Sequence, residues 1–71
     1  MIPYSNITGQ SNITGYEIGK EFIAVQFKNG ETYKYSYDSA GQETVEEMKE
    51  LARGGSGLAG FIQTNAKYDY E

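Results

Sequence analysis

The stretch FIAVQFKNGETYKYSY, residues 22–37, places apolar or aromatic side chains at alternate positions on both sides of a turn at Asn29 and Gly30. This pattern predicts an antiparallel β-hairpin. A two-residue Asn-Gly loop would pair Phe27 with Thr32 and would leave neither face uniformly apolar. A three-residue loop over residues 28–30, with Gly30 left-handed in a glycine bulge, instead gathers six side chains on one face: Ile23, Val25, Phe27, Tyr33, Tyr35 and Tyr37. We therefore expect this loop, with Val25 opposite Tyr33 and Ile23 opposite Tyr35.

A short duplication precedes the hairpin, because SNITG occurs at residues 5–9 and again at 11–15. Two copies are too few for a repeat architecture. The second copy leads into an alternating run through Tyr16 and Ile18, so we expect a single folded domain over residues 11–71 that starts with a strand. Residues 1–10 are expected to be a lead-in, which is either frayed or added as an edge strand.

Two helical patterns follow the hairpin. Val45, Met48, Leu51 and Ala52 form one apolar stripe, which predicts a helix that starts near Asp38 or Ser39 and stops at Gly54 and Gly55. The opposite stripe is charged and consists of Glu43, Glu46, Glu47, Lys49, Glu50 and Arg53. We interpret its four carboxylates, Glu43, Glu46, Glu47 and Glu50, as a solvated face rather than a metal or acid/base site. Ser56 can cap a second helix that buries Leu58, Phe61 and Ile62.

The expected fold is therefore α+β, a three-stranded antiparallel β-meander followed by two α-helices packed on one face. The predicted core consists of apolar side chains from all of these elements and one tyrosine: Ile13, Ile18, Ile23, Val25, Phe27, Tyr35, Val45, Met48, Leu51, Leu58, Phe61 and Ile62.

Composition limits the chemistry. The chain has 71 residues, no Cys and no His, and a net charge of -4 from ten acids and six bases. Thiol chemistry, the usual imidazole acid/base and His or Cys metal sites are excluded, and no nucleophile and base pair is evident, so we expect a non-enzyme without a cofactor. The acidic balance opposes binding to duplex DNA. Without an apolar membrane span or a leader pattern, we expect a cytoplasmic protein that does not bind membranes.

The alternating tyrosines Tyr33, Tyr35 and Tyr37 have two interpretations. Aromatic rings on a sheet can stack against bases, or they can cover the core and point their hydroxyl groups to its rim. We favour core packing for Tyr33 and Tyr35 and leave Tyr37, at the strand end, open between the two.

A glycine-rich segment before the second predicted helix is the other candidate site. Gly55, Ser56 and Gly57 could present backbone amides to a phosphate at a helix N-terminus. The segment lacks the downstream Lys and Ser/Thr of a P-loop, so a plain inter-helix turn is the simpler interpretation. Neighbouring positive charge could come from Lys28, Lys34, Lys67 or Arg53.

Several short motifs, in this order, resemble the KTSC domain: SNI at 11–13, IAVQFKNG at 23–30, YKY at 33–35, GSGLAGFI at 55–62 and KY at 67–68. That small domain occurs at the C-terminus of some lysyl-tRNA synthetases and alone in bacterial and phage proteins. The resemblance implies a β-meander followed by helices, and suggests RNA binding. The chain departs from the pattern in its short connection around residues 19–21, in Gln63 where an Asn is expected, and in residues 39–41 where a proline usually precedes the first helix.

Two functional hypotheses follow. In the first, the chain binds a nucleotide-like ligand or a short RNA through residues that combine rings, cations and amides: Lys28, Tyr33, Lys34, Tyr35, Tyr37, Gly55, Ser56, Gly57, Lys67 and Tyr68. By analogy alone, a phage copy could sequester a host signal nucleotide in this way. In the second, a strand edge with exposed Phe22, Tyr68 and Tyr70 mediates protein interaction or homo-oligomerisation.

Overall fold

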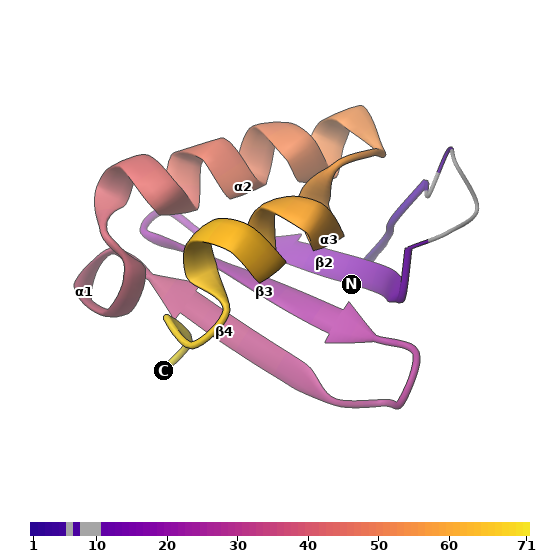
Figure 1. The fold of residues 1–71 in the computed structure, drawn as a ribbon, viewed down its shortest axis with the longest axis horizontal. Helices are drawn as coiled ribbons and strands as arrows, with labels where there is room; N and C mark the ends of the chain where they lie inside the picture. The colour runs from indigo at the N-terminus through magenta and orange to yellow at the C-terminus, as the bar shows by residue number, and fades with distance from the viewer. Residues whose placement is uncertain (6, 8–10) are drawn as a thin grey trace.

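The computed structural model describes residues 1–5, 7 and 11–71, and it forms an α+β domain with helices over one face of an antiparallel sheet (Figure 1). The strands lie in the order β1-β2-β3-β4. Their bounds are β1 Ile2–Pro3, β2 Ile13–Ile18, β3 Phe22–Phe27 and β4 Thr32–Ser36. The helical segments are α1 Tyr37–Ala40, α2 Gln42–Gly54, α3 Leu58–Phe61 and the π-helix η1 Ile62–Ala66.

The central hairpin has the predicted register. Val25 lies opposite Tyr33, and Ile23 lies opposite Tyr35. The loop covers residues 28–30: the Phe27 N–H donates to the Glu31 carbonyl at 2.9 Å, and Gly30 has a φ of 91°. This left-handed conformation favours glycine, so the three-residue loop with a glycine bulge is confirmed.

A β-bulge in β2 decides which of its side chains reach the core. Ile13 lies opposite Phe27 and Gly15 opposite Gln26, so Thr14 is the extra residue. The bulge brings Ile13 onto the same face as Tyr16, although the two are three positions apart. Both side chains are buried, whereas Thr14 is exposed.

The lead-in supplies a fourth strand, where the sequence pattern predicted three. Ile2 pairs with Tyr16 and Pro3 with Gly15 in β1, and the Tyr4 N–H donates to the Thr14 carbonyl at 3.1 Å. A two-residue strand has no alternation to detect, and a proline is tolerated here because β1 is an edge strand. Most of the first SNITG copy, residues 6 and 8–9, lies outside the described residues, so its expected role is not addressed.

Each of the two predicted helices is divided by local backbone geometry. α1 starts after Ser36, whose side chain forms a capping box with Ser39, so the predicted caps at Asp38 or Ser39 are corrected to Ser36. Gly41, with a φ of 92°, separates α1 from α2, and Gly55 in the left-handed conformation ends α2 as predicted. α3 begins after Gly57 without a side-chain cap, so the predicted Ser56 cap is wrong.

The core lies between the sheet and the helices. Its buried members come from all layers: Tyr4, Ile13, Tyr16, Ile23, Val25, Tyr35, Val45, Met48, Ala52, Leu58, Ile62 and Ala66. Ile18, Phe27, Leu51 and Phe61, predicted as core, are only partly buried. The remaining core positions are taken by Tyr4 and Tyr16, which the lead-in and the bulge bring in, and by the small side chains of Ala52 in α2 and Ala66 in η1.

Replacing Ile23 by Ala should lower the free energy of unfolding by about 2–5 kcal/mol, because its side chain is fully buried opposite Tyr35 and its loss leaves a cavity. Gln26→Ala on the other face of the same strand is the control and should change stability by less than about 0.5 kcal/mol. Urea unfolding followed by circular dichroism measures both. Equal losses for the two variants would contradict the assignment of the core face.

Candidate functional site

The free edge of β4 is the feature from which the candidate site is built. The Phe27 N–H bonds to the Glu31 carbonyl, and the Tyr37 N–H bonds to the Glu21 carbonyl. Bonding alternates along an antiparallel pair, so the odd-numbered residues from 31 to 37 bond to β3. The backbone groups of Thr32, Lys34 and Ser36 therefore point away from β3, toward the edge.

Two of these outward groups are already satisfied within the chain. The Ser36 N–H donates to the Ser39 hydroxyl at 3.0 Å, inside the α1 capping box. The Lys34 carbonyl accepts from the Glu71 N–H at 2.8 Å. The segment after η1 thus returns to β4 and covers part of its edge, which is one way in which proteins protect an open strand.

Tyr70, the neighbour of Glu71, packs against two tyrosines of β4, and we call Tyr33, Tyr35 and Tyr70 the tyrosine cluster. The ring of Tyr70 lies 4.6 Å from that of Tyr33 and 6.1 Å from that of Tyr35, measured between centroids. Phe27 meets the far side of Tyr33 edge-on at 5.6 Å. Tyr35 is buried, Tyr33 is half-buried and Tyr70 is 38% exposed. The cluster therefore runs from the core to the surface, and Tyr70 is its outermost ring.

The environment raises the pKa of two phenols of the cluster, those of Tyr33 and Tyr35. Burial raises the pKa of Tyr35 to about 12, with smaller contributions from Tyr70 and Tyr33. The pKa of Tyr33 is raised first by the hydrogen bond that its hydroxyl donates to Glu31, and then by burial. Neutral rings suit stacking and edge-to-face contacts with another aromatic group.

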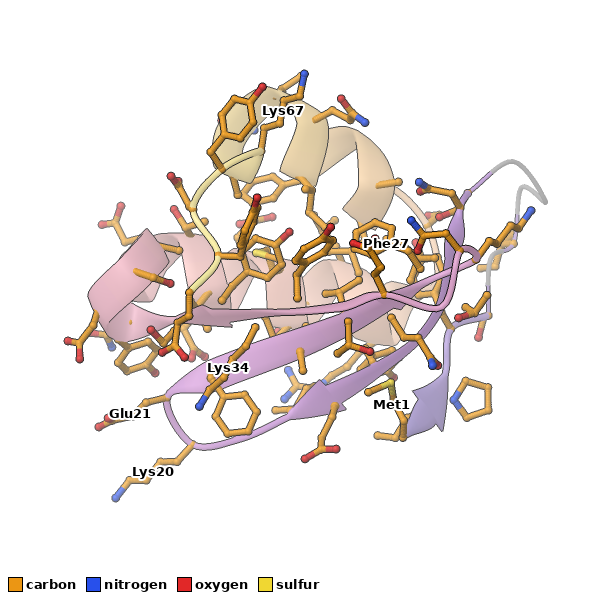
Figure 2. The ribbon with its side chains drawn as sticks, turned by 90° about the horizontal axis from the view of Figure 1, so that it is seen from below. Met1, Lys20, Glu21, Phe27, Lys34 and Lys67 are labelled. Carbon is orange, nitrogen blue, oxygen red and sulfur yellow. The ribbon has the colours of Figure 1, made fainter. Side chains whose placement is uncertain are left out.

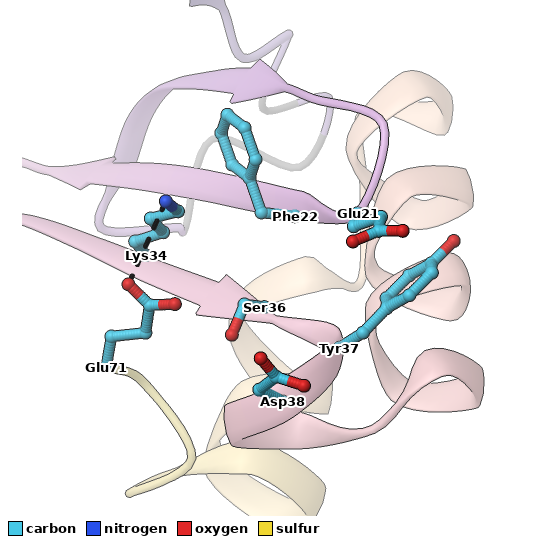
Figure 3. Close-up of a pocket in the computed structure, with 7 residues that line it drawn as sticks. All are labelled: Glu21, Phe22, Lys34, Ser36, Tyr37, Asp38 and Glu71. Atoms are coloured by element: carbon cyan, nitrogen blue, oxygen red, sulfur yellow. Dashed lines mark ion pairs between the residues drawn. The ribbon is translucent and has the colours of Figure 1, made fainter.

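A shallow pocket of about 220 Å³ adjoins the same edge on the outer face of the sheet (Figure 3). Its lining combines two aromatic rings, a lysine, a serine and three carboxylates: Phe22, Tyr37, Lys34, Ser36, Glu21, Asp38 and Glu71. The Lys34 ammonium lies 4.6 Å from the centroid of the Phe22 ring and 3.8 Å from a Glu71 carboxylate oxygen. With three acids and one base the pocket is net negative, which disfavours a phosphate there.

The Gly-Ser segment lies elsewhere, at the far end of α2 and against the lead-in. Gly55 is buried, its N–H donates to the Leu51 and Ala52 carbonyls, and its own carbonyl accepts from the Ile7 N–H. The Leu58 N–H at the start of α3 donates to the Tyr4 hydroxyl at 3.4 Å. Of the three residues expected to bind a phosphate, Gly55 is buried with its N–H bonded inside the chain, whereas Ser56 and Gly57 are exposed.

The remaining predicted site residues do not converge on one surface. Lys34 points away from the helix layer, while Lys67 lies beyond it (Figure 2). Lys67 covers the ring of Tyr68, which is 76% exposed, at 5.5 Å from its centroid. Lys28 is exposed in the hairpin loop. The structure therefore brings Tyr33 and Tyr35 together at the β4 edge, with Lys34 on the opposite face of the same strand.

Lys49 is a polar centre that sequence reasoning missed. It belongs to the charged stripe of α2, whose four carboxylates are exposed as expected, yet Lys49 itself is only 4% exposed. Its ammonium donates to the Lys20 carbonyl at 3.2 Å and to Glu46 at 2.8 Å. Tyr37 donates its hydroxyl to the same carboxylate at 2.7 Å. The Lys49 bond, followed by the Tyr37 bond, lowers the pKa of Glu46.

Comparison with known proteins adds no relative. No family model matches this sequence, and neither the curated proteins nor the solved structures compared with it contain a match. Within residues 1–5, 7 and 11–71, no group of three or more acidic side chains is placed to hold a metal ion. In the same part of the chain, no helix has both the length and the apolar character to cross a membrane.

Tyr4→Phe should destabilise the fold modestly, by about 0.5–1 kcal/mol, because the hydroxyl that accepts from the Leu58 N–H is lost while the ring stays buried. Urea unfolding at neutral pH is the measurement. Tyr68→Phe, at an exposed ring, is the matched control and should have no effect. An unchanged midpoint for Tyr4→Phe would show that the lead-in does not anchor α3 through this bond.

The raised pKa of Tyr35 predicts a loss of stability in alkali. A tyrosine whose pKa is higher in the folded than in the unfolded chain stabilises the fold below the unfolded value of 10.0, and this contribution is lost as the pH rises toward about 12. Tyr35→Phe cannot ionise, so its free energy of unfolding should fall less between about pH 8 and pH 11. Urea unfolding at both pH values tests this, and parallel losses in the two proteins would refute it.

Proposed function

We propose that this chain is a non-enzymatic binding module that holds an extended segment of another protein along the free edge of β4. The observation that carries the proposal is the bond from the Glu71 N–H to the Lys34 carbonyl, made while Tyr70 packs against Tyr33. A piece of the chain distant in sequence already bonds to this edge through its backbone, which is the kind of contact that an added strand makes. The second of the two hypotheses drawn from the sequence, protein interaction, is thus the better supported.

The chemistry of the edge suits a polypeptide. The N–H groups of Thr32 and Lys34 point outward, as the bonding pattern of β4 requires, and a peptide backbone can match their spacing. The two faces of the strand differ, with tyrosine rings on the helix side and Lys34 with Phe22 on the outer side. An added segment would meet these faces with alternate side chains, which provides specificity.

The same geometry is less favourable to an anionic ligand. The pocket beside the edge contains three carboxylates, and Lys34 is already paired with one of them. In the Gly-Ser segment, the Gly55 amide already has partners inside the chain, as has that of Leu58, the residue after the segment. These observations weigh against the proposed phosphate contacts. They do not affect the tyrosine rings, against which a base could still stack.

A nucleotide-like ligand or short RNA is the second candidate, in line with the KTSC resemblance. Two observations favour it. Tyr33 already packs against a flat ring, that of Tyr70, at 4.6 Å between centroids, and the exposed ring of Tyr68 lies next to the Lys67 ammonium. A base could use either ring, since stacking is worth about 1–3 kcal/mol per base. Sequestration of a signal nucleotide remains a proposal by analogy.

Selection of 12-residue peptides from a phage-displayed library, followed by titration of the selected peptide into the ¹⁵N-labelled chain, tests the lead proposal. We expect the largest shifts at the Thr32 and Lys34 amides. Thr32→Pro should abolish binding, because it removes an outward donor at the start of β4 without breaking a bond to β3. Thr32→Val keeps that donor and should bind normally.

The competing outcome is equally specific. If no selected peptide binds at the β4 edge, while calorimetry with mono-, di- and cyclic nucleotides and short RNAs gives heat, the nucleotide proposal replaces the peptide proposal. Salt dependence then separates RNA from a smaller ligand, since phosphate-driven affinity falls with added salt.

A further inference from the structure

We propose that Tyr70 and Glu71 act as an intramolecular occupant of the β4 site, and that the partner segment carries the same pair, an aromatic residue followed by an acidic one. This inference rests on the proposed function and adds the partner's chemistry and the regulation of the site. A partner that binds here must first displace the chain's own residues.

Three contacts define what the site recognises. The Glu71 N–H reaches the Lys34 carbonyl at 2.8 Å, which fixes the backbone against the edge. The preceding ring lies 4.6 Å from Tyr33 and 6.1 Å from Tyr35, on the helix side. The Glu71 carboxylate lies 3.8 Å from the Lys34 ammonium, on the outer side (Figure 3). Successive side chains of an extended segment point to opposite faces, so adjacent aromatic and acidic residues are the pair that fits.

The occupant is attached lightly enough to be exchanged. Tyr70 is 38% exposed, and the Lys34 and Glu71 side chains are each about half exposed, so their ion pair contributes little. One backbone bond and one ring therefore provide most of the attachment. The Asp69 N–H bonds to the Ala66 carbonyl at 3.1 Å, which keeps the segment close to the end of η1.

Competition within the chain sets the apparent affinity for a partner. A segment tethered by a few residues has a high effective concentration at its own site. The apparent dissociation constant of a partner then equals the intrinsic one divided by the fraction of molecules whose site is unoccupied. Weakening the contact of Tyr70 and Glu71 with β4 should therefore tighten binding of the partner. A surface without such an occupant would show no gain in affinity.

The experiment uses the full chain and a peptide with the sequence of residues 64–71, TNAKYDYE. The peptide is titrated into ¹⁵N-labelled native protein and its variants, with the Thr32 and Lys34 amide signals as the readout. Tyr70→Ala should bind the peptide about tenfold more tightly than the native chain, because the site is vacated. Tyr68→Ala is the matched control on the same segment and should bind like the native chain.

A second protein variant protects the test against loss of folding. Glu71→Pro removes the N–H that bonds to Lys34 and leaves all three rings in place, so it should also tighten peptide binding. In the peptide itself, replacing Tyr70 by Ala should abolish binding, and replacing Glu71 by Gln should weaken it slightly.

Three results would overturn the inference. In the first, the native chain, Tyr70→Ala and Glu71→Pro all bind the peptide with the same affinity. In the second, the peptide in which Ala replaces Tyr70 binds as tightly as the parent peptide. In the third, TNAKYDYE binds to none of the proteins. If library-selected peptides still bind at the Thr32 and Lys34 amides in any of these cases, the proposed function stands and only the inference fails. If they do not, both fall together.

Discussion

The left-handed conformation of Gly30 is the constraint on which the rest of this domain depends. It closes a three-residue loop and so places Tyr33 and Tyr35 on the same face as Val25 and Ile23. A loop shorter by one residue would turn every side chain of β4 to the other face. The core would then lose Tyr35, and the tyrosines would face solvent opposite the helices.

The same register explains why one strand has two chemical surfaces. Its odd-numbered residues bond to β3 and send their rings toward the helices, whereas Thr32 and Lys34 present backbone groups to the edge. Tyr35 stabilises the core, Tyr33 forms the boundary with solvent, and Tyr37 leaves the strand to bond with Glu46. Core packing, the interpretation favoured for both rings, therefore holds in full for Tyr35 and in part for Tyr33, which is half-buried against the core.

The parts of the fold that follow from local periodicity could be predicted from the sequence. The hairpin register and the apolar stripe of α2 are of this kind. For the lead-in, the sequence left a frayed segment and an edge strand as alternatives, and β1 is an edge strand. The Thr14 bulge and the burial of Tyr4 could not be predicted, because each depends on a partner distant in the chain. For the candidate site, alternation identified Tyr33 and Tyr35, but no local pattern indicates that Tyr70 returns to them. In the Gly-Ser segment the local sequence instead suggests a site that the fold disfavours. Its glycines suit a phosphate, but tertiary contacts occupy part of its backbone.

Lys49 has a consequence for the orientation of α2. A buried ammonium must keep its acceptors, and here one is the Lys20 carbonyl in the turn between β2 and β3 while another is Glu46 on the helix itself. The apolar side chains Val45, Met48 and Ala52 fix which face of α2 is turned toward the sheet. A hydrogen bond adds a requirement of direction, because rotation of the helix about its axis would separate the Lys49 ammonium from the Lys20 carbonyl. Lys49 therefore ties the rotational position of α2 to the turn between β2 and β3.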